Sequence, residues 1–320
     1  MEAISEQWEA MTTSFTSTIR ERVQHIEAMP AIPAVFLPLL KMLSSSTEEV
    51  KVDEVVRLVS YDNTIAAQCL RVASSPLFGL AQSPKSIKAA VIGLGLRRVE
   101  TILLTCCLGQ AFPAGKWALD PDVFWKHSLG CAMVCRKFSE KLSAVDGEKA
   151  YMAGLLHDLG FMVNCLVFSR EFATAVERAC REEIPLHEAE RVSMGFTHCE
   201  TGRALAEKWK LADDIIEVIA HHHAIDQSQN AQPLVALVHL SDLLCRMRGL
   251  GYGYYERHKV DLISDPAWAI LLKDHRDLDG VDLARFTFEL DEAVEEIHAL
   301  VSTVFGSSSG ARTLTRTGSP

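Results

Sequence analysis

The sequence lacks the surplus of basic residues that nucleic-acid-binding proteins usually carry. Asp and Glu total 42 and Lys and Arg total 32, so the formal net charge at pH 7 is −10. Proteins that bind nucleic acid by neutralising phosphates normally present a basic surface. Because this chain has only short basic stretches, its charge argues against a nucleic-acid partner.

The sequence also lacks the cysteine spacing of a disulfide framework. It has nine cysteines, an odd number, with no C-x-x-C pair, and most of them lie within apolar runs. This pattern favours reduced, mostly buried thiols in a cytosolic protein. Cys131 and Cys135 have the i, i+4 spacing of a metal-binding pair, but the apolar residues around them favour a role as small core residues.

No apolar run is long enough to cross a bilayer. The longest near-apolar stretch, residues 102–112, is interrupted by polar residues and reaches about half the length of a membrane span. The first ten residues, MEAISEQWEA, carry glutamates where a signal peptide needs basic and then apolar residues. We therefore expect a cytoplasmic protein that makes no use of a membrane.

The hydrophobic pattern is helical along nearly the whole chain. In residues 52–59, valines recur at the i, i+3, i+4 and i+7 positions of one helix face. No stretch shows the alternation of apolar and polar residues, bounded by hairpin turns, that predicts a strand. The pattern therefore predicts an all-α protein built of many short helices.

Three local signals predict where helices begin and where the chain divides. Pro38 fits best in the first turn of a helix that starts near Phe36. Thr197 and Glu200 form a capping box, which predicts a helix running to about Trp209. Residues 113–121 contain two prolines and a glycine and are the best candidate for an internal boundary.

Histidine and aspartate residues give the strongest functional signal. Twelve histidines and seventeen aspartates in 320 residues give about 0.6 His-Asp pairs by chance, so a single pair is uninformative. The order and spacing of several histidine-containing stretches carry the information instead. These stretches are residues 125–128, 155–160, 197–200, 221–223 and 238–242.

Further segments resemble a known family. They are PAIPA at 30–34, RLVSYDNTIAAQCLRVASSPLFG at 57–79 and the Ser-Ile helix at 86–93. Together with the histidine stretches, they resemble the HDOD family, the HD-related output domains of bacterial signalling proteins. Asn63 and Ser74 depart from the proline and asparagine that are usual in that pattern. The resemblance covers about residues 25–245.

The resemblance implies a multi-helix HDOD fold in which an N-terminal helical subdomain packs on an HD-like helical subdomain. It predicts these boundaries: an N-terminal helical extension at 1–24, the HDOD domain at 25–245 with halves 25–113 and 114–245, C-terminal helices at 246–305, and a disordered tail at 306–320.

By similarity to HD and HD-GYP phosphohydrolases, the resemblance also implies metal ligands. Asp158 would bridge two ions, one held by His127, His157 and Asp242 and the other by His198, His222 and His223. His221 is the register alternative within the triple histidine. Imidazole and carboxylate together suit Fe, Mn, Zn, Ni or Co better than Mg. One or two divalent ions are therefore expected, and the alternative is a buried polar network that holds no metal.

The departures from those enzymes bear on activity. Phe161 stands where they carry a phosphate-contacting lysine, Ala224 stands in place of a glutamate, and the Gly-Tyr-Pro loop is absent; Tyr252 belongs to a different loop, which we expect to pack against the body. We therefore predict a regulatory module that acts on protein partners in trans, with a homodimer as a further option. The alternative is a metal-dependent phosphohydrolase, either a phosphodiesterase or a nucleotide phosphatase, with a mono- or binuclear centre.

Overall fold

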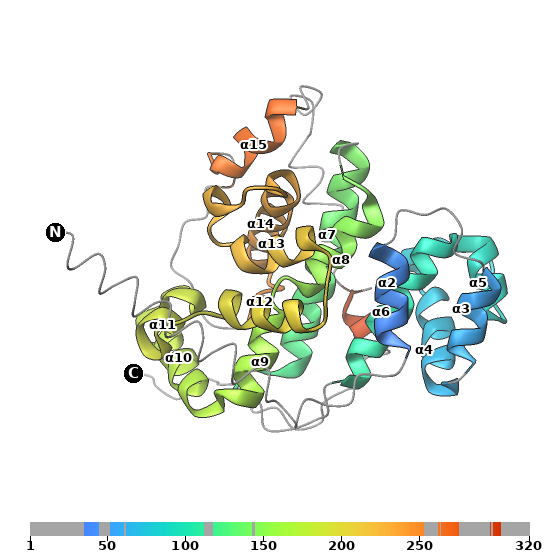
Figure 1. Cartoon of the computed structure of the whole chain (residues 1–320), viewed down its shortest axis with the longest axis horizontal. Helices are drawn as coiled ribbons and strands as arrows, with labels where there is room; N and C mark the ends of the chain where they lie inside the picture. The colour runs from blue at the N-terminus through green and yellow to red at the C-terminus, as the bar shows by residue number, and fades with distance from the viewer. Residues whose placement is uncertain are drawn as a thin grey trace.

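The structure, a computed structural model, is all-helical throughout the part of the chain that it describes. These residues are 35–44, 52–60, 62–111, 118–142, 145–252, 262, 264–274, 295 and 297–301. Every regular element among them is an α-helix or a short 3-10 helix (Figure 1). The predicted fold class is confirmed.

The N-terminal half forms a bundle of short helices, on the right in Figure 1. Its elements are α2 (Phe36–Ser44), α3 (Val52–Val59), α4 (Asn63–Ala73), η1 (Pro76–Phe78), α5 (Ile87–Leu94) and α6 (Leu96–Ala111). Pro38 lies in the first turn of α2, as predicted. Val55 and Val59 are buried on the predicted apolar face of α3. The longest helix of this half, α6, packs on α2, α4 and α5.

The HD-like half and the chain that follows it supply the remaining helices. They are α7 (Pro121–Leu142), α8 (Gly147–Leu156), α9 (Leu159–Val167), α10 (Ser169–Glu182), α11 (Leu186–Met194), α12 (His198–Lys208), α13 (Asp213–His221), η2 (Ile225–Gln227), α14 (Gln232–Met247) and α15 (Pro266–Asp274). α8 and α14 both pack on α7, and α12 packs on α9. The predicted capping box is present, with Thr197 as the N-cap of α12.

One apolar segment of the described chain has the length and composition of a membrane span. It runs from Gly147 to Val167, and 89% of its most apolar window is buried inside the fold. The segment is not one helix, because His157 and Asp158 form a turn between α8 and α9. It is therefore the core of the HD-like half, and it carries a pair of buried polar residues at its centre.

The two halves are packed on one another through α6 and α8. Thr101 donates a hydrogen bond from its hydroxyl to Glu148 Oε2 at 2.6 Å, and the Thr105 hydroxyl lies 3.3 Å from that of Tyr151. The ring of Phe36 on α2 meets Trp209 edge-on at 5.3 Å. These contacts confirm that an N-terminal helical subdomain packs on an HD-like one.

Several sequence predictions concern residues outside the described part of the chain. They are the extension at 1–24, the turn at 30–34, the tail at 306–320 and most of the C-terminal helices. The predicted domain boundaries therefore stay predictions. All nine cysteines are free, and all except Cys180 are buried, which agrees with the expectation of reduced core thiols.

Candidate metal centre

The seven predicted ligand residues converge on one place in the HD-like half. They come from α7 (His127), the α8–α9 turn (His157 and Asp158), the first residue of α12 (His198), the end of α13 (His222 and His223) and α14 (Asp242). All except His223 are buried, with 0% or 1% of their surface exposed. Helices far apart in the sequence therefore meet at a single polar cluster inside the core.

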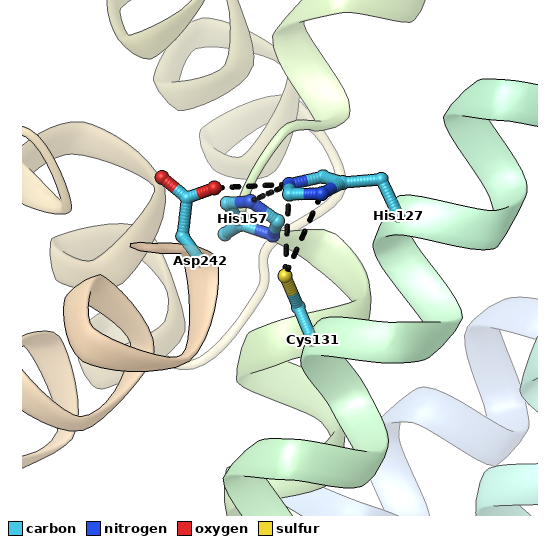
Figure 2. Close-up of side chains that lie close together, drawn as sticks. All are labelled: His127, Cys131, His157 and Asp242. Carbon is cyan, nitrogen blue, oxygen red and sulfur yellow. Dashed lines mark hydrogen bonds and ion pairs between the residues drawn. The ribbon is translucent and has the colours of Figure 1, made fainter. Parts of the chain in front are cut away.

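One side of the cluster is formed by His127, His157 and Asp242 (Figure 2). His127 Nε2 lies 3.1 Å from Asp242 Oδ1 and 3.3 Å from His157 Nε2. Bonds of about 2.0–2.2 Å from one ion to nitrogen and oxygen place neighbouring ligand atoms roughly 3.0–3.5 Å apart. The ligand atoms of these three residues and Cys131 Sγ all lie within 4.8 Å of one another, which suits a single metal position, called here the first position.

The other side is formed by His198, His222 and His223, and is called here the second position. His198 Nε2 lies 3.3 Å from His222 Nε2. Each of these nitrogens also faces Asp158 Oδ1, at 3.2 and 3.3 Å. A ligand atom of His223 lies within 4.8 Å of the rest of this set. The spacing again suits one ion.

Asp158 lies between the two positions. Its Oδ2 is 3.0 Å from His157 Nε2 and 3.5 Å from His127 Nε2, while its Oδ1 faces the second position. Each position thus receives one oxygen of the same carboxylate. This is the placement that a bridging ligand needs, and bridging by Asp158 stays a prediction about the metal-bound protein.

Backbone carbonyl groups on the side away from the centre orient three of the imidazole rings. The Nδ1 atoms of His127 and His157 lie 2.8 Å from the carbonyl oxygens of Leu250 and Gly154. His222 Nδ1 lies 3.1 Å from the Val218 carbonyl oxygen. A carbonyl only accepts hydrogen bonds, so these Nδ1 atoms carry a proton, and in the neutral ring each Nε2 atom presents its lone pair to the centre.

This orientation is a test of whether the residues fit a metal. Burial lowers the pKa of His222 to about 4, so near neutral pH its Nε2 has no proton to donate to Asp158. Asp158 Oδ1 is buried and accepts no hydrogen bond. The His222 lone pair therefore faces the Asp158 carboxylate in the core, and the positive charge beside them is that of His198, whose pKa Glu190 raises well above its usual value against the effect of burial. A metal ion satisfies both His222 and Asp158, whereas a metal-free polar network leaves the His222 lone pair without a donor.

The two carboxyls of the centre are held ionised. Burial alone would raise the pKa of Asp158, but His157 and then His198 outweigh burial and hold it well below its usual value. For Asp242, the Arg246 guanidinium and His127 outweigh burial in the same way. Both side chains are thus available as anionic ligands.

Sequence reasoning missed three residues at this centre. The buried carboxylate of Glu190 lies 2.6 Å from His198 Nδ1. The Tyr252 hydroxyl donates a hydrogen bond to Asp158 Oδ2, although its loop was expected only to pack against the body. Cys131 is a buried core residue as predicted, but its Sγ also lies 3.6 Å from His127 Nε2. Its i+4 spacing from His127 was the signal that could have indicated this.

Phe161 and His221 also have defined places. The ring centroid of Phe161 lies 4.0 Å from that of His198, so Phe161 covers this side of the centre. His221, the register alternative, lines a cleft and belongs to neither metal position.

The cleft opens beside the second position, between α11, α12 and α13. It has a volume of about 640 Å³. The ring of His187 stacks on that of His223 at 4.2 Å in its wall. Polar residues of the lining include His187, Arg191, Arg203, His221, His223 and Gln227. His223 is therefore the ligand residue that connects the buried centre to this cleft.

Comparisons with known proteins identify the family and the fold. The family model of the HDOD domain matches residues 29–225. The solved structure of a Geobacter sulfurreducens HDOD domain protein of unknown function is 31% identical, with a TM-score of 0.80, and covers 92% of this chain and 99% of its own. It shares the fold over nearly the whole length of both chains.

Two more distant structures share the fold alone, at 19% identity. A Marinobacter aquaeolei protein provisionally named for signal transduction has a TM-score of 0.70 and covers 90% of this chain and 66% of its own. A Shewanella amazonensis protein provisionally named a phosphohydrolase has a TM-score of 0.68, with 88% and 97% covered. An uncharacterised Treponema pallidum protein is 25% identical over 262 residues, or 80% of this chain, and this chain spans 49% of that relative's length.

Proposed function

Because this chain belongs to the HDOD family, we propose that it is a regulatory signalling module that acts on partner proteins and holds one or two divalent transition-metal ions. The candidate ions are Fe, Mn, Zn and Ni. One observation carries the proposal: the Nε2 atoms of four buried imidazoles, from helices far apart in the sequence, lie within 3.5 Å of the oxygens of one buried carboxylate, Asp158. Cations bound between these groups satisfy all of them at once.

The closed form of the centre supports a regulatory role. Structural metal sites are enclosed by protein, whereas catalytic sites keep a coordination position open to substrate. Here Tyr252 packs with its ring 4.5 Å from that of His127, and Phe161 covers His198 from another side. Apart from the side of His223, which meets the cleft, a metal in this centre would be enclosed by protein and would link α7, the α8–α9 turn, α12 and α14.

The side chains of the centre are already arranged to bind metal ions. His127, His157 and Asp242 would hold the first ion, and His198, His222 and His223 the second, with Asp158 between them. The bound ions would supply positive charge that the facing lone pairs and carboxylates require. The backbone carbonyls behind the rings keep each Nε2 directed inward before any metal arrives.

Elemental analysis of full-length protein, purified without affinity tag or chelator, tests the proposal. We expect one or two equivalents of transition metal in the wild type and loss of metal in the double variant His157→Ala/Asp158→Ala. His221→Ala is the matched control, since it removes a nearby imidazole from neither position, and it should keep its metal. A folded wild type that binds none of the four ions would overturn the proposal.

The cleft favours a second candidate function, a metal-dependent phosphohydrolase. Its volume of about 640 Å³ lies within the range of small-molecule sites, roughly 300–1,000 Å³. A metal at the second position would supply an activated water. Arg191 and Arg203, which pair with Glu200 and Glu207 in this structure, would have to turn from those carboxylates to contact a phosphate group. Turnover of phosphodiesters or nucleotides by metal-loaded protein, abolished by Asp158→Ala, would establish this function in place of the purely regulatory one.

A further inference from the structure

We propose that the two metal positions are unequal. The second position binds its ion tightly and fills first, while the first position is weaker and exchangeable. The inference rests on the proposed metal-holding function. Two contacts carry it. The Glu190 carboxylate binds the outer nitrogen of His198, a ligand of the second position. The Arg246 guanidinium binds Asp242, a ligand of the first position.

Glu190 backs the second position. Its Oε2 accepts hydrogen bonds from His198 Nδ1 at 2.6 Å and from the His198 backbone N–H at 3.0 Å. Its Oε1 accepts from the side-chain amide of Asn164 at 2.8 Å, and Asn164 Oδ1 accepts from Thr201 at 2.8 Å. A carboxylate that is held in place behind an imidazole makes that ring a more basic and better oriented ligand.

The histidines of the first position lack this support. His127 and His157 direct their Nδ1 atoms to neutral backbone carbonyls. Among the ligand histidines with a recorded Nδ1 partner, His198 alone has a carboxylate behind it. The second position therefore has the stronger imidazole donor and an additional negative charge next to it.

Arg246 opposes metal binding at the first position. It lies one turn after Asp242 on α14, and its Nε donates to Asp242 Oδ1 at 2.7 Å. The same oxygen faces His127 Nε2 at 3.1 Å. An ion at the first position must share this oxygen with the guanidinium or displace it, and the positive charge of Arg246 offsets the negative charge that Asp242 contributes.

The two oxygens of the Asp158 carboxylate, which lies between the positions, also differ in a way that favours the second position. Asp158 Oδ2, the oxygen that faces the first position, already accepts a hydrogen bond from Tyr252. Asp158 Oδ1, which faces the second position, accepts none. Both carboxylate oxygens directed at the first position are thus engaged by donors of the protein, while the oxygen directed at the second is available.

Calorimetric titration of the metal-depleted full chain with Zn²⁺, checked by elemental analysis, tests the inference. We expect a tight step and a separate weaker step. Glu190→Gln keeps the shape of the side chain and should weaken the tight step by about 10–100-fold. Arg246→Met and Tyr252→Phe each remove a competing donor and should tighten the weak step, by roughly tenfold for the charge-assisted contact of Arg246. Arg178→Gln, on the distant surface of α10, is the charge-matched control and should change neither step.

The results separate this inference from the proposed function. If the folded wild type binds no metal, the proposed function itself fails. If it binds two ions in steps of equal affinity, or if Glu190→Gln weakens both steps alike, the positions are not unequal in the way stated and the inference is overturned. If Glu190→Gln does not fold, Arg246→Met and Tyr252→Phe decide: failure of both to tighten the weak step would overturn it.

Discussion

Replacement of Gly160 by alanine should destroy the second metal position without changing any ligand side chain. Gly160 lies two residues after Asp158, where α9 crosses α12. A Cβ atom built at this position would lie 1.8 Å from the backbone carbonyl oxygen of His198 and 2.8 Å from the amide nitrogen of Gly202. Neither atom belongs to a side chain that could rotate away, so the two helices themselves must separate.

The required displacement is large on the scale of the site. Contacts below 3.0 Å are essentially never seen for a real Cβ, and ordinary van der Waals contact begins at 3.4 Å. The His198 carbonyl must therefore retreat by about 1.2–1.6 Å, whereas His198 Nε2 is only 3.2 Å from Asp158 Oδ1. Overpacking of a core costs 1–3 kcal/mol and sometimes more, and a backbone clash predicts a loss of about 3 kcal/mol.

Thermal unfolding and metal analysis of Gly160→Ala measure the two effects. We expect a Tm lower by roughly 5–10 °C and loss of the ion at the second position. Gly147→Ala, at the first residue of α8, is the control because its Cβ would meet neighbours at 3.4 and 3.5 Å, so it should keep both Tm and metal. If Gly160→Ala keeps wild-type Tm and full metal content, the close approach of α9 and α12 is wrong.

Three further predictions concern stability. Burial raises the pKa of Glu100 from 4.5 to about 7, so the folded state binds more protons between these values and stability falls as pH rises through them. Glu100→Gln should therefore stabilise the protein by about 1–2 kcal/mol at pH 8, after allowance for solvent screening, and leave stability unchanged below pH 4.5. Chemical denaturation across pH checks this, with Glu171→Gln at an exposed position of α10 as the matched control. Thr197→Ala should cost about 1 kcal/mol through loss of the α12 cap, measured by denaturant midpoint, and an unchanged midpoint would contradict the capping role. Chelation should lower Tm, since an ion at 1,000 times its Kd contributes about 4 kcal/mol; a scan unchanged by chelator would show that no bound metal stabilises the fold.

The sequence predicts the helices well where local signals are strong. The valine stripe at 52–59 coincides with α3, the proline at 38 with the first turn of α2, and the Thr197 capping box with the start of α12. These signals are local, because hydrophobic period and capping depend on residues within two turns. The packing of α6 on α8 has no such signal and depends on contacts between residues about 50 positions apart.

The ligand residues could be proposed from a family resemblance, but their environment could not. Glu190 lies on an amphipathic helix, where a glutamate normally faces solvent, and only the fold turns it toward His198. Tyr252 reaches Asp158 across 94 positions of sequence. Arg246, one turn from Asp242, has the i, i+4 spacing of an ion pair, so this contact alone of the three was open to prediction from spacing.

The position of α8 joins the metal centre to the rest of the molecule. Its C-terminal end carries Gly154, whose carbonyl orients His157, and its N-terminal turn carries Glu148, which binds Thr101 and Arg98 of α6. A change in metal occupancy that moves His157 should therefore also move α8, whose N-terminal turn contacts α6 of the N-terminal half. If the first position exchanges its ion while the second keeps it, the signal is a change at His127, His157 and Asp242 alone, and α8 is the element that carries it to α6. Metal occupancy of the first position and the packing of the two halves at Glu148 are then thermodynamically coupled.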